Sequence, residues 1–216
     1  MSPYIHKLIL QGEHQQLDFK FQVNDSRKIA RTLSAFANTD GGKLLIGVKD
    51  NGVIAGVRTE EEYHMIEAAA NMYCKPEVEF AYRSWNLDGK RVLEIDVPEL
   101  EQKPCFAMTD DKRWMAYVRV ADQNILAAPI QIKYWNRLKS ERGTLIRYSD
   151  NEKILLQHLN EHPFITLSKF SRLASIPRYL AENVIVNLMI AGLVELGQNE
   201  KQTWFRLADP EKGEVQ

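Results

Sequence analysis

The passage that most constrains the fold lies between residues 25 and 48, where a helical pattern stops at two glycines and an apolar run follows at once. Either Asp25 or Ser26 would cap a helix, and the apolar residues after them repeat at the spacing of one helical face: Ile29, Leu33, Phe36 and Ala37. The same spacing leaves polar residues on the outer face: Arg27, Lys28, Arg31 and Ser34. "NTDGG" then ends the helix, and "KLLIGV" lacks polar alternation, which is typical of a strand covered on both faces.

An earlier strand is predicted in "LDFKF", whose period-2 pattern separates a buried face (Leu17, Phe19, Phe21) from an exposed one (Asp18, Lys20). Asn51-Gly52 between apolar runs predicts a hairpin, and Thr59 would cap a second helix. Further strands are predicted at 77–84, 91–97, about 104–108 and 114–120, and a helix at about 129–139. This mixture indicates an α+β domain with a mixed sheet.

The second half of the chain has a different character. The polar segment "SERGTLIRYSD" marks a boundary, which predicts a first domain at 1–140, a linker at 141–149, a second domain at 150–208 and an acidic tail at 209–216. Helices are predicted in "NEKILLQHLN", after the cap Thr166, and from the cap Ser175 to Gly192. Two strands, "VELG" and "TWFRL", follow. This order is typical of a small winged helix-turn-helix, with residues 177–191 as the recognition helix.

Composition limits the partners and the compartment. The 28 Lys and Arg against 29 Asp and Glu give a net charge of -1, so nucleic-acid binding would have to be local. Cys74 and Cys105 form neither a disulfide framework nor a zinc motif, which fits a reducing cytoplasm. No signal-peptide pattern or membrane-length apolar run is present, so we expect a soluble intracellular protein that does not bind membranes.

The first domain resembles the Schlafen-type AlbA-like domain, which is found in many bacterial regulators and in vertebrate Schlafen proteins. The resemblance covers about residues 5–138. It is carried by an ordered series of elements: Gly12-Glu13, Asp18-Phe19-Lys20, Ala35 to Asp40, Gly41-Gly42, Gly47 to Asp50, Ile54-Ala55-Gly56 and Tyr117 to Val120.

This resemblance implies two different activities. Bacterial members are described as DNA-binding or transcription-regulator modules, often joined to a helix-turn-helix or an ATP-binding part. Vertebrate Schlafen proteins include endoribonucleases that cut transfer and ribosomal RNA with three acidic residues and a divalent metal. By position, that triad falls here on Glu13, Asp18 and Asp50. The second member is usually Glu, and Asp18 is one methylene shorter.

The acidic residues have a chemical and a structural interpretation. Carboxylates with open positions suit Mg²⁺ or Mn²⁺, which can activate water for phosphodiester cleavage. Alternatively, Glu13 ends a helix, Asp18 pairs with Lys20 or Arg119, and Asp50 is a turn residue. "ANTDGG" is expected to end a helix rather than cradle a phosphate, and no Walker motif is present, so we expect no ATP site.

Candidate nucleic-acid contacts come from both halves of the chain. In the first domain they are the basic residues Lys20, Lys28, Arg31 and Arg119. Beside the winged helix lies a basic stretch: Lys133, Arg137, Lys139, Arg142 and Arg147. The second domain offers Arg178, Asn183, Asn187 and Lys201, whereas Tyr179, Val184, Ile185, Leu188 and Met189 are predicted to be core. Residues 150–208 balance six basic against six acidic side chains, so docking or dimerisation remains an alternative.

The sequence therefore predicts a cytoplasmic, two-domain DNA-binding transcriptional regulator that acts as a homodimer. A metal-dependent endoribonuclease acting on structured RNA and a docking module that binds no nucleic acid are the alternatives. We favour binding over catalysis because Asp18 is shorter than the residue usual at its position.

Overall fold

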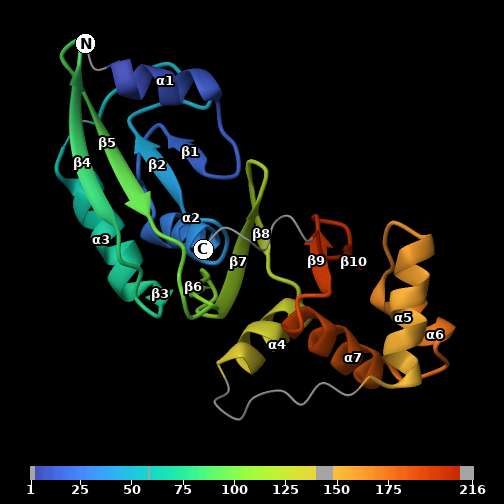
Figure 1. Cartoon of the computed structure of the whole chain (residues 1–216). Coiled ribbons are helices and arrows are strands. Elements are labelled where there is room, and N and C mark those ends of the chain that lie inside the picture. Colours follow the sequence, from blue (N-terminus) through green and yellow to red (C-terminus); the bar gives the residue numbers. More distant parts are fainter. Residues whose placement is uncertain (1–2, 58, 140–147, 210–216) are drawn as a thin grey trace. The chain divides into compact units, whose positions relative to one another are not determined.

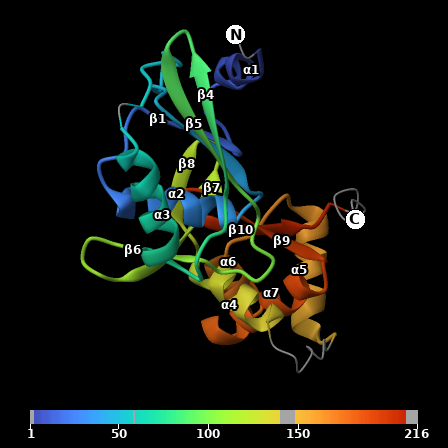
Figure 2. The same ribbon diagram turned by 90° about the vertical axis from the view of Figure 1, so that its left-hand side faces the viewer.

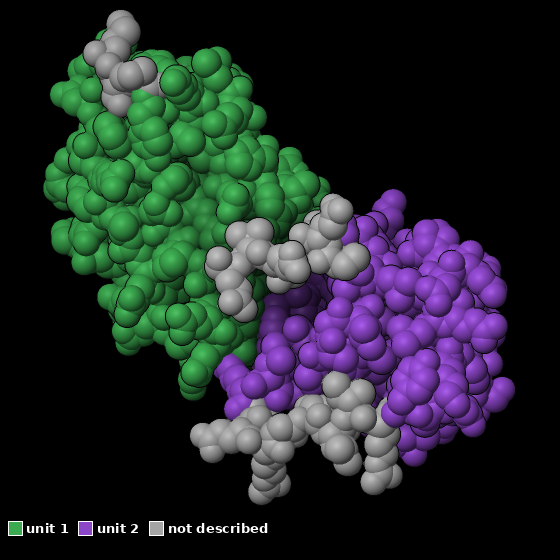
Figure 3. Space-filling view, viewed as in Figure 1, with its two compact units in different colours: residues 1–127 green, residues 128–216 purple. Residues whose placement is uncertain are grey.

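A computed structural model describes residues 3–57, 59–139 and 148–209 (Figure 1). It divides into two units, residues 1–127 and residues 128–216 (Figure 3). Most of the predicted linker at 141–149 and of the predicted tail at 209–216 lies outside the described residues, as do Arg142 and Arg147. Within the described ranges, no helix has the length and apolar character needed to cross a membrane.

Unit 1 contains two four-stranded sheets (Figure 1 and Figure 2). The first has the order β1 (Leu17–Lys20), β2 (Gly42–Ile46), β5 (Lys90–Val97) and β4 (Ala81–Leu87). β1 and β2 are parallel, and the other pairs are antiparallel, so the sheet is mixed as the sequence predicts. The second sheet is antiparallel, in the order β3 (Cys74–Lys75), β6 (Phe106–Met108), β7 (Trp114–Val120) and β8 (Gln123–Leu126).

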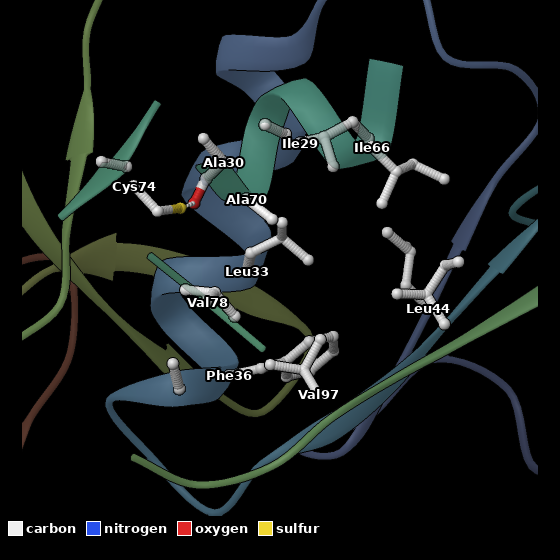
Figure 4. Close-up of a cluster of buried hydrophobic side chains, with 14 of the residues drawn as sticks. Ile29, Ala30, Leu33, Phe36, Leu44, Ile66, Ala70, Cys74, Val78 and Val97 are labelled. Atoms are coloured by element: carbon white, nitrogen blue, oxygen red, sulfur yellow. Dashed lines mark hydrogen bonds between the residues drawn. The ribbon is translucent and has the colours of Figure 1, made fainter. Parts of the chain in front are cut away.

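Helix α2 (Ser26–Ala37) lies against both sheets and against α3 (Glu61–Met72). The Asp25 side chain caps it by accepting a hydrogen bond from the Arg27 amide, as predicted. Figure 4 shows Leu33 and Phe36 of α2 in a cluster with Leu44, Ile66 and Val97, which come from β2, α3 and β5. Because α2 is covered on more than one side, residues beyond a single apolar stripe are buried.

Ser34 was predicted on the outer face of α2, and this prediction is wrong. Its side chain is fully buried and its hydroxyl donates to the Cys105 carbonyl at 2.9 Å. The Tyr117 amide donates back to the same hydroxyl at 3.3 Å. A strand of the second sheet covers this side of the helix, and the hydroxyl pairs with its backbone.

Strand β1 also differs from the expected half-buried strand. Helix α1 (Pro3–Gln11), which the sequence analysis gave only as an alternative setting for Glu13, contributes Ile5, which packs with Leu17 and Phe19. Asp18, expected on an exposed face, is only 2% exposed, because β1 is covered on both faces. Phe21 lies beyond the strand and is 37% exposed.

The hairpin predicted at Asn51-Gly52 is a tight turn with a single bridge. The Gly52 amide donates to the Lys49 carbonyl at 2.7 Å, and Val48 pairs with Ile54. Gly52 has a φ of 78°, a conformation that favours glycine. Beyond this bridge the amides of Ala55 and Gly56 both donate to the Gly47 carbonyl, and the described residues that follow Ile54 add no further bridge to Val48.

The described residues of unit 2 form four helices and one hairpin: α4 (Pro129–Leu138), α5 (Asp150–Glu161), α6 (Leu167–Leu173), α7 (Arg178–Ile190), and the antiparallel pair β9 (Val194–Gln198) and β10 (Thr203–Leu207). From α5 onward the elements follow the predicted order. Phe170, Ile185 and Phe205 are fully buried in their common core. Helix α7 is not capped by Ser175 as predicted; its N-cap is Pro177, and Ser175 has a φ of 53° in the preceding turn.

Helix α4 lies on the other side of the predicted domain boundary. The sequence placed residues 129–139 in the first domain, whereas the structure groups this helix with residues 128–216. Ile130 is 6% exposed and belongs to the same core as Phe170 and Phe205. The polar segment that suggested the boundary follows α4, so composition alone could not show which core the helix joins.

Candidate functional site

Two of the three predicted acidic residues lie together at the start of β1. Glu13 follows the end of α1, after Gly12 in the left-handed conformation. The Phe19 amide donates to Glu13 Oε1 at 2.8 Å and to Asp18 Oδ1 at 3.0 Å. Lys20 Nζ also donates to Asp18 Oδ1, at 2.9 Å. The return of the chain from α1 into β1 therefore brings Glu13 back beside Asp18.

The two carboxyl groups have opposite pKa shifts. Burial and a hydrogen bond to Asp18 raise the pKa of Glu13 to about 7. Burial disfavours the charged form of Asp18, but the hydrogen bond with Glu13 and the charges of Lys20 and Arg119 outweigh it and lower the pKa of Asp18. Where the pair binds one proton, Glu13 therefore holds it and Asp18 is the anion.

The third acidic residue does not join this pair. Asp18 is in register with Leu44 of β2, whereas Asp50 lies beyond the end of β2, exposed in the turn. In the part of the chain that the structure describes, no group of three His, Cys, Asp or Glu residues is arranged to hold a metal. Lys20 and Arg119 already compensate the charge of Asp18, at 2.9 and 3.6 Å. This arrangement does not fit a divalent ion shared by the predicted triad.

Arg119 was predicted to contact phosphate, but it is a buried structural residue. Its side chain is 1% exposed, and its guanidinium donates to the Leu17 carbonyl at 3.1 Å and to Asn124 Oδ1 at 3.0 Å. Further hydrogen bonds reach the His14 carbonyl. Arg119 therefore ties β7 to β1, and this prediction is corrected.

The other basic residues predicted in unit 1 differ in accessibility. Lys20 pairs with Asp18, and Arg31 pairs with Asp110 at 3.5 Å. Lys28 is exposed on α2 and has no ion pair among the described residues. The structure does not bring these side chains into one basic surface with Arg119.

Three of the predicted contacts in unit 2, Arg137, Asn183 and Asn187, bind one another, and a fourth, Lys133, pairs with Glu182. Lys133 Nζ lies 3.3 Å from Glu182 Oε2. Arg137 Nη1 donates to Asn187 Oδ1 at 2.6 Å, and its Nη2 donates to Asn183 Oδ1 at 3.0 Å. Helix α4, which carries both cations, runs beside α7 (Figure 1). The middle of α7 is therefore covered on the side that the sequence predicted to face a ligand.

The segment from α6 into the first turn of α7 is open. Arg172 and Lys169 are exposed on α6, and the Arg178 side chain is 68% exposed at the start of α7. Tyr179, predicted to be core, is 61% exposed, because the first turn of α7 projects beyond the core. Lys201 is exposed in the turn between β9 and β10.

Sequence reasoning did not select Lys169, Arg172 or Tyr179 as site residues. Lys169 and Arg172 are three residues apart on one helix, and each lies two residues after a buried one, Leu167 and Phe170. That spacing is the signal that could have identified them as one exposed face.

Comparison with known proteins supports the interpretation of unit 1. Residues 13–128 match the family model described as Schlafen, AlbA_2. The chain belongs to this family. The Schlafen AlbA_2 match covers residues 13–128 and ends one residue beyond unit 1, so all elements of unit 2, α4 to β10, lie outside it. No curated protein gives a significant match.

Two solved structures are distantly similar to this Schlafen AlbA_2 chain. The DIP2311 protein from Corynebacterium diphtheriae is 18% identical, with a TM-score of 0.45 over 68% of this chain, which spans 30% of that structure. The N-terminal domain of a RecG-related protein from Nitrosomonas europaea is also 18% identical, with a TM-score of 0.38 over 67% of this chain and 96% of that domain.

Proposed function

We propose that this chain is a cytoplasmic DNA-binding regulator whose second unit binds duplex DNA as a winged helix-turn-helix. The observation that carries the proposal is the open, cationic segment from α6 into the first turn of α7. It lies in the helix order that the sequence predicts for this kind of module. The buried free thiols of Cys74 and Cys105 fit a reducing compartment.

The contacts are assigned by what each element offers. In helix-turn-helix modules, the second helix approaches DNA with its N-terminal residues. Here those residues are Arg178 and Tyr179, both exposed. Lys169 and Arg172 on α6 and Lys201 between β9 and β10 supply further cations for phosphate oxygens.

The charge of unit 2 limits the strength of this binding. Residues 150–208 balance six cations against six carboxylates, and Arg178 Nε already lies 3.5 Å from Glu182 Oε1. A protein that neutralises about four phosphates should lose affinity with a slope of about -3 to -4 in a plot of log affinity against log salt. We therefore expect binding that is clear at low salt and weak near physiological salt.

Fluorescence anisotropy with a labelled duplex at several salt concentrations tests the proposal. Arg178→Ala and Lys201→Ala should each weaken binding and reduce the salt slope by about one. Lys153→Ala is the matched control, because this exposed lysine lies on α5 and pairs with Asp150. Absence of binding at low salt would reject the proposal. The stoichiometry of the titration also tests whether the chain binds as the predicted homodimer.

A further inference from the structure

We infer that unit 2 binds DNA without reading its sequence, because α4 occupies the base-reading residues of α7. This inference rests on the proposed function and specifies its ligand: duplex DNA of any sequence, held through its phosphates. It comes from the contacts between α4 and α7, which the sequence did not predict.

The side chain of Arg137 bridges two amide side chains of α7. Its two terminal nitrogens donate separately to Asn187 Oδ1 at 2.6 Å and to Asn183 Oδ1 at 3.0 Å. Asn183 and Asn187 are four residues apart and therefore lie one turn apart on the same face of α7. A planar guanidinium suits this arrangement, because its donors form a fixed fork.

These hydrogen bonds engage the side-chain oxygens through which an asparagine would contact a base. An asparagine reads adenine by accepting from N6 through its carbonyl oxygen and donating to N7 through its nitrogen. In this structure Arg137 occupies the carbonyl oxygens of both Asn183 and Asn187. Because its donor is charged, each bond is stronger than a neutral one, and a base edge would have to displace it or share the oxygen with the Arg137 guanidinium.

The neighbouring acidic residue is neutralised in the same way. Glu182 lies 3.3 Å from Lys133 of α4 and 3.5 Å from Arg178. A carboxylate on this face could accept a hydrogen bond from cytosine N4. Its pairing with two cations competes with that contact and also reduces its repulsion of phosphates.

Helix α4 is held against α7 by apolar packing as well as by polar contacts. Ile130 is 6% exposed and packs in the core that contains Ile185 and Leu188 of α7. The partly buried Tyr134 packs against the same core. Displacing α4 would therefore expose apolar surface as well as break the contacts of Lys133 and Arg137.

The part of α7 that remains open is its first turn. Arg178 and Tyr179 are exposed there. Three further exposed cations lie outside α7: Lys169 and Arg172 on α6, and Lys201 between β9 and β10. Lysine and arginine contacts to phosphates position a protein on DNA but carry no sequence information. We therefore expect similar affinities for duplexes of unrelated sequence.

Nuclear magnetic resonance of the whole chain during titration with duplex DNA tests this directly. The backbone signals of Arg178 and Tyr179 should shift, while the side-chain amide signals of Asn183 and Asn187 should stay in place. If no signal of the chain moves, the proposed function fails. If the asparagine amide signals shift together with those of the first turn, DNA binding stands and the present inference is overturned.

Affinity measurements give a second, independent test. Across several unrelated duplexes, affinities should agree within about threefold, whereas sequence-specific binders typically differ by about 1,000-fold or more from non-specific binding. We expect the affinity for DNA to be the same in the variants Asn183→Ala and Asn187→Ala as in the parent chain. The control is Asn160→Ala, at an exposed position of α5, which should also leave the affinity unchanged. A preference for one duplex that Asn183→Ala or Asn187→Ala removes would contradict the inference.

Discussion

Asn38 illustrates how a motif residue supports the fold of unit 1. It ends α2 within the stretch "AFANT", and it is 2% exposed. Its side-chain nitrogen donates to the carbonyls of Cys105 and Tyr117 at 2.7 and 2.8 Å, and its oxygen accepts from the Cys105 amide at 2.7 Å. The helix end is therefore bonded to the second sheet through a single amide.

Asn38→Ala should destabilise unit 1 strongly. It leaves the Cys105 amide and the Tyr117 carbonyl without this partner in the core, while the Cys105 carbonyl keeps the Ser34 hydroxyl, and each unsatisfied group costs about 1–3 kcal/mol. We expect a loss of about 3 kcal/mol or more in the free energy of unfolding, measured by urea denaturation. The control Asn71→Ala, at an exposed position in the last turn of α3, should change it by less than about 0.5 kcal/mol. Equal effects of the two substitutions would contradict this role.

Glu13 gives unit 1 a pH dependence of defined sign. Its pKa is raised from 4.5 to about 7, so between these values the folded state binds more protons than the unfolded state. The contribution of Glu13 to stability is therefore complete below pH 4.5 and is lost as the pH rises towards 7. Glutamine at this position stays neutral, and it can still accept from the Phe19 amide and donate to Asp18.

Glu13→Gln should therefore be nearly neutral at pH 5 and should raise stability relative to the parent chain at pH 8. Urea denaturation at both pH values measures the difference. The control Glu79→Gln, at an exposed position, should show no such change between the two pH values. A Glu13→Gln effect that is the same at pH 5 and pH 8 would mean that Glu13 is ionised throughout this range.

At the scale of the elements, α4 determines what α7 can do. Its apolar side places Ile130 in the core of unit 2, and its polar side covers Glu182, Asn183 and Asn187. The same helix thus supports the module and restricts its exposed surface to the first turn of α7. Periodicity identified both helices, but it could not show that they face each other.

Ile130→Ala should destabilise unit 2, because removing a buried isoleucine side chain costs about 2–5 kcal/mol. Hydrogen exchange resolved by residue should show the loss in α5, α7 and β10, with α2 and β7 unaffected. Leu138→Ala on the same helix is the control, since Leu138 is 52% exposed. Loss of protection in unit 1 instead would place α4 with the first domain, as the sequence suggested.

At the scale of the whole molecule, each unit has a hydrophobic core of its own. The cores of unit 1 are formed around α2 and beneath α1, and the core of unit 2 is formed by α4 to β10. The net charge of -1 provides no general attraction for nucleic acid. The proposed DNA contact therefore depends on where a few cations lie, which composition could not show.

The sequence by itself determined the elements whose signals are local. The Asp25 cap, the stop at Gly41-Gly42 and the order from α5 to β10 follow from capping, glycine conformation and apolar spacing. The ordered motifs of unit 1 also identified the family, because they depend on residue order and not on contacts. Such signals are complete within a few residues of chain, so no tertiary information is needed to recognise them.

Only the tertiary structure decided which polar residues are free to act. Asp18 is buried because other elements cover the face that alternation marked as exposed, and Arg119, a predicted phosphate contact, is buried where β7 meets β1. Asn183 and Asn187 are occupied because Arg137 reaches them from a helix about 50 residues earlier in the chain. Periodicity shows which face of an element is apolar, whereas the availability of its polar face depends on what packs there from distant parts of the sequence.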